Sequence, residues 1–358
     1  MKMFVAGAIL LFALPLTAEV TVRSLPASPL IERTQNAQAL GFDLLLENKT
    51  DETLELSRIE ASVLAKDDVL VLQRRLQRNG DSISTLANRE MKPGAKLVIF
   101  NPFHDFEPDV ELRRIRYDLW FDVGEESEKH QASIVIEPQP YAGRTSLILP
   151  LRGRVLVHDG HDYLSHHRRL DITGGMTTAL GISDNMMRYS YDLVVIDPRG
   201  NMHRGTGNAN EEWYGFGTAV VAPGDGVVVA MANDRQDGTQ EQRAPMELAD
   251  VLKDFTRIYG NYVVIDHGTG EFSVLAHLKQ GSVKVQAGDR VKQGATIAAM
   301  GSSGDSMFPH LHYQLQRDAR TGEGLPSYFS DYRRLTGAAF VKVKRGQIDT
   351  GDVVESMR

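Results

Sequence analysis

The chain has 358 residues, of which 42% are hydrophobic and 24% charged, a composition typical of a folded protein with room for two hydrophobic cores. Its formal net charge of −7 comes from interspersed acids and bases, so it has no basic stripe of the kind that binds phosphate backbones, and we expect no nucleic-acid partner. The absence of cysteine excludes a disulfide framework and leaves histidines and carboxylates to hold any metal.

Residues 1–18 are predicted to be an export signal. One lysine precedes a short apolar run, which Pro15 interrupts and which ends in small residues at Ala18. The run is shorter than the ~20 residues that a spanning helix needs. We therefore predict cleavage, no stable membrane span afterwards, and a periplasmic or cell-envelope location. The alternative is an uncleaved membrane anchor.

Residues 19–140 are predicted to form a β-sandwich, because short apolar runs alternate there with polar turns. The clearest run is 115–123, in which Ile115, Tyr117 and Leu119 would share one face. No residue pattern in this region indicates catalysis. Its role stays open between targeting, covering a cleft and binding a protein partner.

A segment rich in proline and glycine, 137–143, marks the boundary to a second domain, predicted over 141–320. Repeated short apolar runs between glycine-rich turns again indicate strands, so the whole chain is predicted to be mainly all-β. One exception is 246–260, which lacks strand alternation and is predicted to be helical. Residues 321–358 are weakly patterned and are expected to form a C-terminal extension.

The histidines are concentrated in this second domain. Nine of the 11 lie there, at positions 158, 161, 166, 167, 203, 267, 277, 310 and 312. In a strand, residues two apart point to the same face, so His310 and His312 would present two imidazoles side by side. By itself such a pair does not establish a metal site.

The order of the surrounding motifs resembles the lysostaphin and LytM type of zinc metallopeptidases. The motifs are GTAVVAPGDGVVV at 217–229, with Ala219 where proline is usual, His277-Leu278, a hairpin at 285–297, the turn GSSG at 301–304, and His310-Leu311-His312. The resemblance covers about 185–316. Similar hairpins occur in biotinyl and lipoyl carrier domains, but the lysine that a carrier presents at its turn is missing here.

The resemblance implies a small antiparallel, barrel-like peptidase domain holding one zinc ion. It assigns Asp192 and His312 as metal ligands and His277 and His310 as catalytic residues. The family's remaining ligand is the first residue of an H-x-G-x-D segment, where this chain has Arg188. His167 is our first choice to replace it, with His166 as an alternate. A second alternate is His203, although there Gly207 stands in place of the family's aspartate.

Three protein ligands leave one position of a tetrahedral zinc open, as in catalytic sites. No H-E-x-x-H helix supplies a glutamate base, so the resemblance implies that His277 and His310 handle the proton and the oxyanion. It also implies the peptide stems of bacterial peptidoglycan as substrate. The function predicted is an exported endopeptidase of peptidoglycan crosslinks. The alternative is an inactive LytM-like wall-binding protein or an activator of other wall hydrolases.

Overall fold

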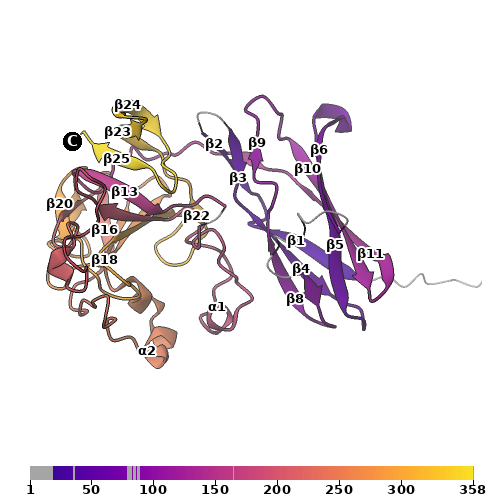
Figure 1. The fold of residues 1–358 in the computed structure, drawn as a ribbon, viewed down its shortest axis with the longest axis horizontal. Helices are drawn as coiled ribbons and strands as arrows, with labels where there is room; N and C mark the ends of the chain where they lie inside the picture. The colour runs from indigo at the N-terminus through magenta and orange to yellow at the C-terminus, as the bar shows by residue number, and fades with distance from the viewer. Residues whose placement is uncertain are drawn as a thin grey trace, which may run out of the picture.

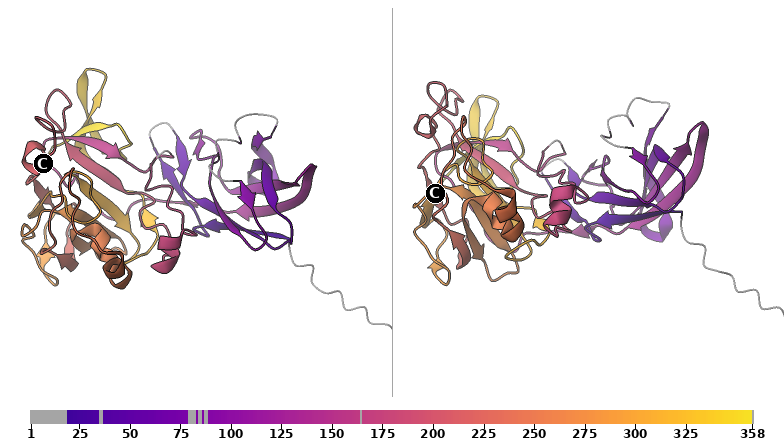
Figure 2. Two further views of the ribbon diagram at one scale, coloured as in Figure 1. Left: turned by 60° about the horizontal axis from the view of Figure 1, so that its bottom comes forward. Right: turned by 90° about the horizontal axis from the view of Figure 1, so that it is seen from below.

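The structure, a computed structural model, describes residues 19–34, 37–78, 83, 86, 89–163 and 165–357. The predicted export signal lies outside these residues. Two lobes lie end to end, one built from the strands up to β12 and the other from β13 onward (Figures 1 and 2). Both are dominated by strands, so the predicted mainly β fold is confirmed. Within the described ranges, no helix is long and apolar enough to cross a membrane.

The described residues of the N-terminal lobe form three sheets, ordered β1-β4-β8, β11-β10-β5-β6 with β7 beside β5, and β12-β2-β3-β9. Ile115, Tyr117 and Leu119 on β10 are buried in its core, as their alternation predicted. The elements of this lobe are β1 (Val20–Leu25), β2 (Leu30–Arg33), β3 (Gln38–Leu40), β4 (Asp43–Asn48), β5 (Leu54–Leu64), η1 (Lys66–Asp68), β6 (Leu70–Gln77), β7 (Glu90–Met91), β8 (Lys96–Phe100), β9 (Asp105–Phe106), β10 (Arg114–Val123), β11 (Glu126–Ile136) and β12 (Gln139–Pro140).

The C-terminal lobe is organised by one long sheet, ordered β19-β16-β17-β18-β21-β14-β13-β25-β23-β24 with β22 beside β21; β15 and β20 form a separate pair. Its strands are β13 (Arg154–Asp159), β14 (Tyr191–Val195), β15 (Ala219–Val221), β16 (Gly226–Ala232), β17 (Asn261–Asp266), β18 (Phe272–Leu278), β19 (Arg290–Val291), β20 (Thr296–Ala299), β21 (Leu311–Gln316), β22 (Gly324–Leu325), β23 (Phe329–Thr336), β24 (Ala339–Gly346) and β25 (Val353–Ser356). Its short helices are α1 (Gly175–Ala179), η3 (Asn210–Glu212), α2 (Leu248–Lys253) and η4 (Phe255–Tyr259).

Two details of this lobe bear on the sequence predictions. The helix expected over 246–260 is present as α2 and η4, which are separated at Asp254; its carboxylate caps η4 by accepting from the Thr256 amide at 3.1 Å. In the region expected to form a C-terminal extension, β25 pairs with β13 and β23 inside the long sheet, and Val354 is buried in the core. β24 has no buried residue, which explains why the sequence there lacks a clear apolar pattern.

Polar contacts join the two lobes at the end of β2. The buried Glu32 carboxylate lies 3.0 Å from Nε2 of His161 and also accepts from Gln347. Burial disfavours the charged imidazole, but Glu32, together with the charges of Asp349 and Asp162, outweighs burial and raises the pKa of His161 above its ordinary value.

A raised pKa in the folded state makes stability depend on pH. The contribution of His161 should be fully present below its unfolded pKa of about 6.5 and should be lost as pH rises through the higher folded value. We expect the free energy of unfolding to fall more between pH 6 and pH 9 in the wild type than in His161→Gln. Urea titrations across that range test this, and parallel pH curves for the two proteins would contradict it.

Candidate metal centre

Three neighbouring strands bring the predicted site residues to one face of the long sheet. Asp192 on β14 stands directly opposite His312 on β21, and Ala276 on β18 stands opposite His312 from the other side. Residues directly opposite each other in antiparallel strands share a face. His310 immediately precedes β21 and lies two residues from His312, so its side chain faces the same way.

His277 reaches this face because β18 contains an irregularity. Simple alternation would place it with Leu275, which points into the main core on the opposite face. The register between β17 and β18 shifts between Asn261 and Val263, and His277 adopts a left-handed backbone with φ of 58°. A bulge of this kind re-aims a side chain. The His277 ring consequently lies 4.7 Å from that of His310, centroid to centroid.

The Asp192 carboxylate is the centre of the cluster. Its Oδ1 atom lies 3.1 Å from Nδ1 of His312 and 3.5 Å from Nε2 of His167. Zinc bonds of ~2.0–2.1 Å arranged tetrahedrally separate two ligand atoms by about 3.3 Å. Nε2 of His310 also lies 3.5 Å from this oxygen. The donor types and their spacing around Asp192 therefore fit a zinc ion.

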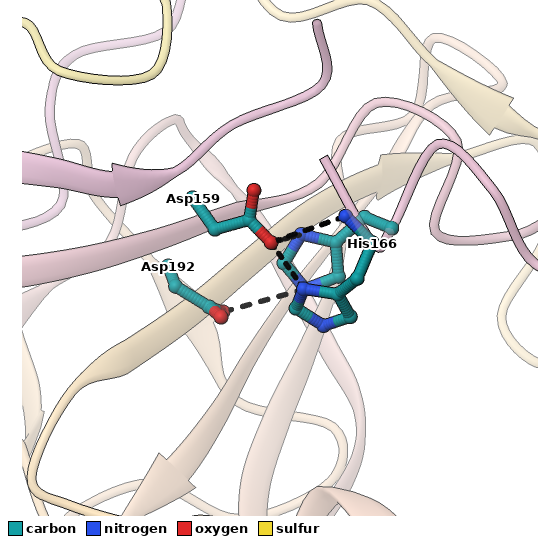
Figure 3. Close-up of side chains that lie close together, drawn as sticks. Asp159, His166 and Asp192 are labelled. Atoms are coloured by element: carbon teal, nitrogen blue, oxygen red, sulfur yellow. Dashed lines mark hydrogen bonds and ion pairs between the residues drawn. The ribbon is translucent and has the colours of Figure 1, made fainter. Parts of the chain in front are cut away.

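The end of β13 contributes a second aspartate, Asp159, which the sequence predictions omit. Ligand atoms of Asp159, His166, His167 and Asp192 all lie within 4.8 Å of one another. Both aspartates point toward the loop that carries His166, and Asp159 pairs with Nδ1 of His166 (Figure 3). The His167 side chain is 2% exposed, whereas that of His166 is 66% exposed. Burial beside Asp192 favours His167 as the ligand and leaves His166 as a partner of Asp159.

His203 lies outside the cavity that contains the other candidate residues. Its ring packs on the indole of Trp213 at 4.8 Å between centroids, and its backbone bridges to the same residue. His203 therefore has a packing role against Trp213.

We expect His203→Ala to keep its zinc. His166→Ala should lose at most a small part of its zinc affinity, whereas His167→Ala should lose the metal. Zinc titration of the three variants tests this, and loss of zinc in His203→Ala would restore the alternate assignment.

Backbone and amide groups orient the histidine rings. Nε2–H of His312 donates to Oε1 of Gln314 at 2.9 Å, which directs Nδ1 toward Asp192. Nδ1 of His277 donates to the Ser303 carbonyl at 2.8 Å, and Nδ1 of His310 donates to the Phe308 carbonyl at 2.9 Å. His277 therefore has Nε2 available to accept a proton or a ligand, whereas Nε2 of His310 faces the Asp192 carboxylate at 3.5 Å. Partners of this kind select the tautomer at metal and catalytic histidines.

The local electrostatics keep His167 and Asp192 deprotonated, as metal binding requires. Burial lowers the pKa of His167 to about 3, so its imidazole is neutral at pH 7. Burial opposes ionisation of Asp192, but the neighbouring His310 and His167 outweigh it and hold the pKa of this carboxyl well below its usual range. Burial, followed by repulsion from His310 and His312, holds the pKa of His277 well below its ordinary value.

Residues 201–323 match Peptidase family M23. The second lobe carries an M23 peptidase domain. The predicted resemblance to the lysostaphin and LytM type is thereby confirmed for this part of the chain. The match begins after His167 and Asp192, so the assignment of those two residues rests on the geometry around His312.

The M23 domain is similar to several curated proteins. The peptidoglycan DD-endopeptidase ShyC of Vibrio cholerae is 33% identical over 142 residues, which are 38% of this chain and 25% of ShyC. The murein hydrolase activator EnvC of Escherichia coli is 33% identical over 86 residues, which are 23% of this chain and 20% of EnvC. The chain thus spans a quarter or less of these relatives. Among solved structures, the catalytic domain of lysostaphin from Staphylococcus simulans aligns at 21% identity with a TM-score of 0.25, covering 41% of this chain and 79% of that domain.

The site of the M23 domain opens into a cavity of about 530 Å³. His167, Asp192, His277, His310 and His312 all line it. The rest of the wall is largely apolar, and the only Lys or Arg among its lining residues is Arg243, which pairs with Asp305 at 3.4 Å. The cavity is large enough for a short peptide segment.

Arg188, at the position where the family has a metal-binding histidine, points away from this cavity. It is 1% exposed, lies 2.6 Å from Asp43 of the N-terminal lobe, and pairs with Glu323. In place of the family's histidine, this chain therefore has a buried arginine that pairs with two carboxylates. His167 enters the site from a different loop.

Proposed function

We propose that the chain is an exported, zinc-dependent metalloendopeptidase that hydrolyses peptide crosslinks of bacterial peptidoglycan. The observation that carries this proposal is the convergence of His167 and His312 on the Asp192 carboxylate, with His277 and His310 beside them in one cavity. Relatives such as the peptidoglycan DD-endopeptidase ShyC of Vibrio cholerae support the substrate class. Export follows from that substrate and from the sequence of residues 1–18.

In this proposal His167, Asp192 and His312 hold the zinc ion. Zinc in such a site supplies Lewis-acid polarisation of the scissile carbonyl and acidifies water. The Asp192 carboxylate contributes the single negative charge among the ligands and stays ionised through its histidine neighbours. Gln314 fixes His312 in the tautomer that turns Nδ1 toward the metal position.

His277 and His310 perform the proton transfers. Each donates Nδ1–H to a backbone carbonyl, so Nε2 can accept a proton from the attacking water or donate one to the oxyanion or the leaving amine. The two have opposite tendencies. Burial and nearby histidines hold the pKa of His277 down. For His310, burial opposes the charged form, but the charge of Asp192 and the hydrogen bonds to Asp192 and the Phe308 carbonyl together raise the pKa. His277 is therefore suited to act as the base and His310 as the proton donor.

One experiment tests the proposal. The purified protein is analysed for zinc and incubated with peptidoglycan, and the released muropeptides are separated. We expect about one zinc per chain and conversion of crosslinked dimers to monomers, both abolished by chelation. Protein that holds no zinc and cuts nothing, but increases the activity of another wall hydrolase, would replace the proposal with the activator alternative.

A further inference from the structure

A buried ion-pair cluster joins the N-terminal lobe to the metal centre. Asp43, at the start of β4, accepts from Arg168 at 2.9 Å with one oxygen and from Arg188 at 2.6 Å with the other. Arg168 also donates to the Phe42 carbonyl at 2.9 Å, and Arg188 also pairs with Glu323. All four charged side chains are at most 7% exposed.

The two arginines belong to the two segments that carry the proposed ligands. Arg168 directly follows His167, and Arg188 lies four residues before Asp192. Asn185 ties these segments together, because its amide nitrogen donates to the His167 carbonyl at 3.0 Å and to the Arg168 carbonyl at 3.3 Å. The Asn185 backbone amide in turn donates to Glu323 at 3.1 Å. The loop with His167 and the approach to Asp192 are therefore fastened to each other and to Asp43.

The charges explain why both lobes are needed. Two arginines and two carboxylates balance within the cluster, and a buried arginine that loses its partner is strongly unfavourable. Among the described residues of the C-terminal lobe, Glu323 is the carboxylate that pairs with one of these arginines, Arg188. The described ion pair of Arg168 is with Asp43 in the N-terminal lobe. If the lobes separated, the Arg168 guanidinium would lose its carboxylate partner and turn toward solvent, and the adjacent His167 would move with it.

We propose that Asp43 is a positioning residue of the metal centre: the N-terminal lobe holds His167 in place, and zinc binding is coupled to docking of the lobes. This inference rests on the proposed zinc site. It also accounts for the altered motif. Where the family has a metal-binding histidine, this chain has Arg188, which pairs with Asp43. The proposed replacement ligand, His167, comes from the loop that Asp43 holds through Arg168. By linkage, bound zinc must also stabilise the docked lobes.

Asp43→Asn tests the inference, with Asp122→Asn as the matched control. Asp122 is another buried aspartate of the same lobe, paired with Arg78 at 2.6 Å away from the lobe junction. We expect Asp43→Asn to lower zinc affinity by ~10- to 100-fold, as loss of an outer partner does, and the control to leave it unchanged. At saturating zinc, kcat of Asp43→Asn should return toward the wild-type value, whereas general unfolding would not be rescued.

A second measurement does not depend on the metal. Amide hydrogen exchange of zinc-free protein should be faster across 165–168 in Asp43→Asn than in the wild type, and unchanged in Asp122→Asn. Arg168→Lys is a milder variant in case Asp43→Asn fails to fold, because it keeps the charge but not both hydrogen bonds. It should raise the exchange rate across 165–168 by a smaller amount. If the wild type binds zinc and Asp43→Asn binds it equally well, the inference is wrong while the proposed function stands. If no variant binds zinc, the proposed function fails, and unchanged exchange would overturn the anchoring role as well.

Discussion

Asp192→Asn is expected to release zinc and abolish hydrolysis of peptidoglycan crosslinks. The carboxylate is the one anionic ligand of the proposed set and lies within 3.5 Å of both proposed imidazole ligands. Its loss removes the negative charge and a ligand oxygen at the same time. We expect zinc affinity to fall by more than ~100-fold, the upper figure for loss of an outer partner alone. Zinc titration and muropeptide release measure the two effects.

The control for this prediction is Asp197→Asn. Asp197 lies just beyond β14 in an exposed turn, where it accepts from the Asn201 side chain at 3.0 Å and does not line the cavity. His312→Ala should reproduce the loss of zinc and activity seen in Asp192→Asn. Activity that survives in His312→Ala would show that the metal is held elsewhere, with Asp159 and His166 as the next donors to examine.

His277→Gln and His310→Gln are expected to separate catalysis from metal binding. Neither side chain belongs to the proposed ligand set, so both variants should retain zinc. Each should lose ~10²- to 10⁴-fold in kcat, the range for removal of a general acid or base. Turnover of a crosslinked muropeptide, measured at saturating zinc, tests the loss, and elemental analysis confirms that the metal is still bound.

The matched control for these variants is His267→Gln. Its ring lies outside the cavity and contacts the Asp225 carbonyl at 2.7 Å and the Ser273 hydroxyl at 2.8 Å. We expect it to change stability without changing kcat. If His277→Gln keeps full turnover, the roles assigned to the two histidines are wrong, even if zinc is bound as proposed.

Site features that depend only on the spacing of residues within one strand or hairpin could be predicted from the sequence. His310 and His312 lie two residues apart in or beside a strand, so the pleat alone puts them on one face. The order of glycine-rich hairpins between 217 and 304 was enough to indicate the M23 family, because those turns need particular residues at particular intervals. Asp192 was readable as well, since it lies at the start of a buried strand in the family order.

Other features depended on irregular pairing. Period-two alternation places His277 on the core side of β18, and only the register shift against β17 turns its ring to the metal face. His166 and His167 are neighbours, and no periodicity distinguishes them. The buried position of His167 beside Asp192, against the exposed position of His166 beside Asp159, separates them.

The sequence by itself was enough to predict a mainly β chain with an M23 domain. It also pointed to the site histidines, most of which line one cavity. Tertiary structure decided which loop histidine stands beside Asp192, why Arg188 turns away, and that β23, β24 and β25 complete the long sheet. The physical reason is distance along the chain. Asp43 meets Arg168 across 125 residues and Arg188 across 145, and such contacts between buried charges leave no periodic trace in either segment.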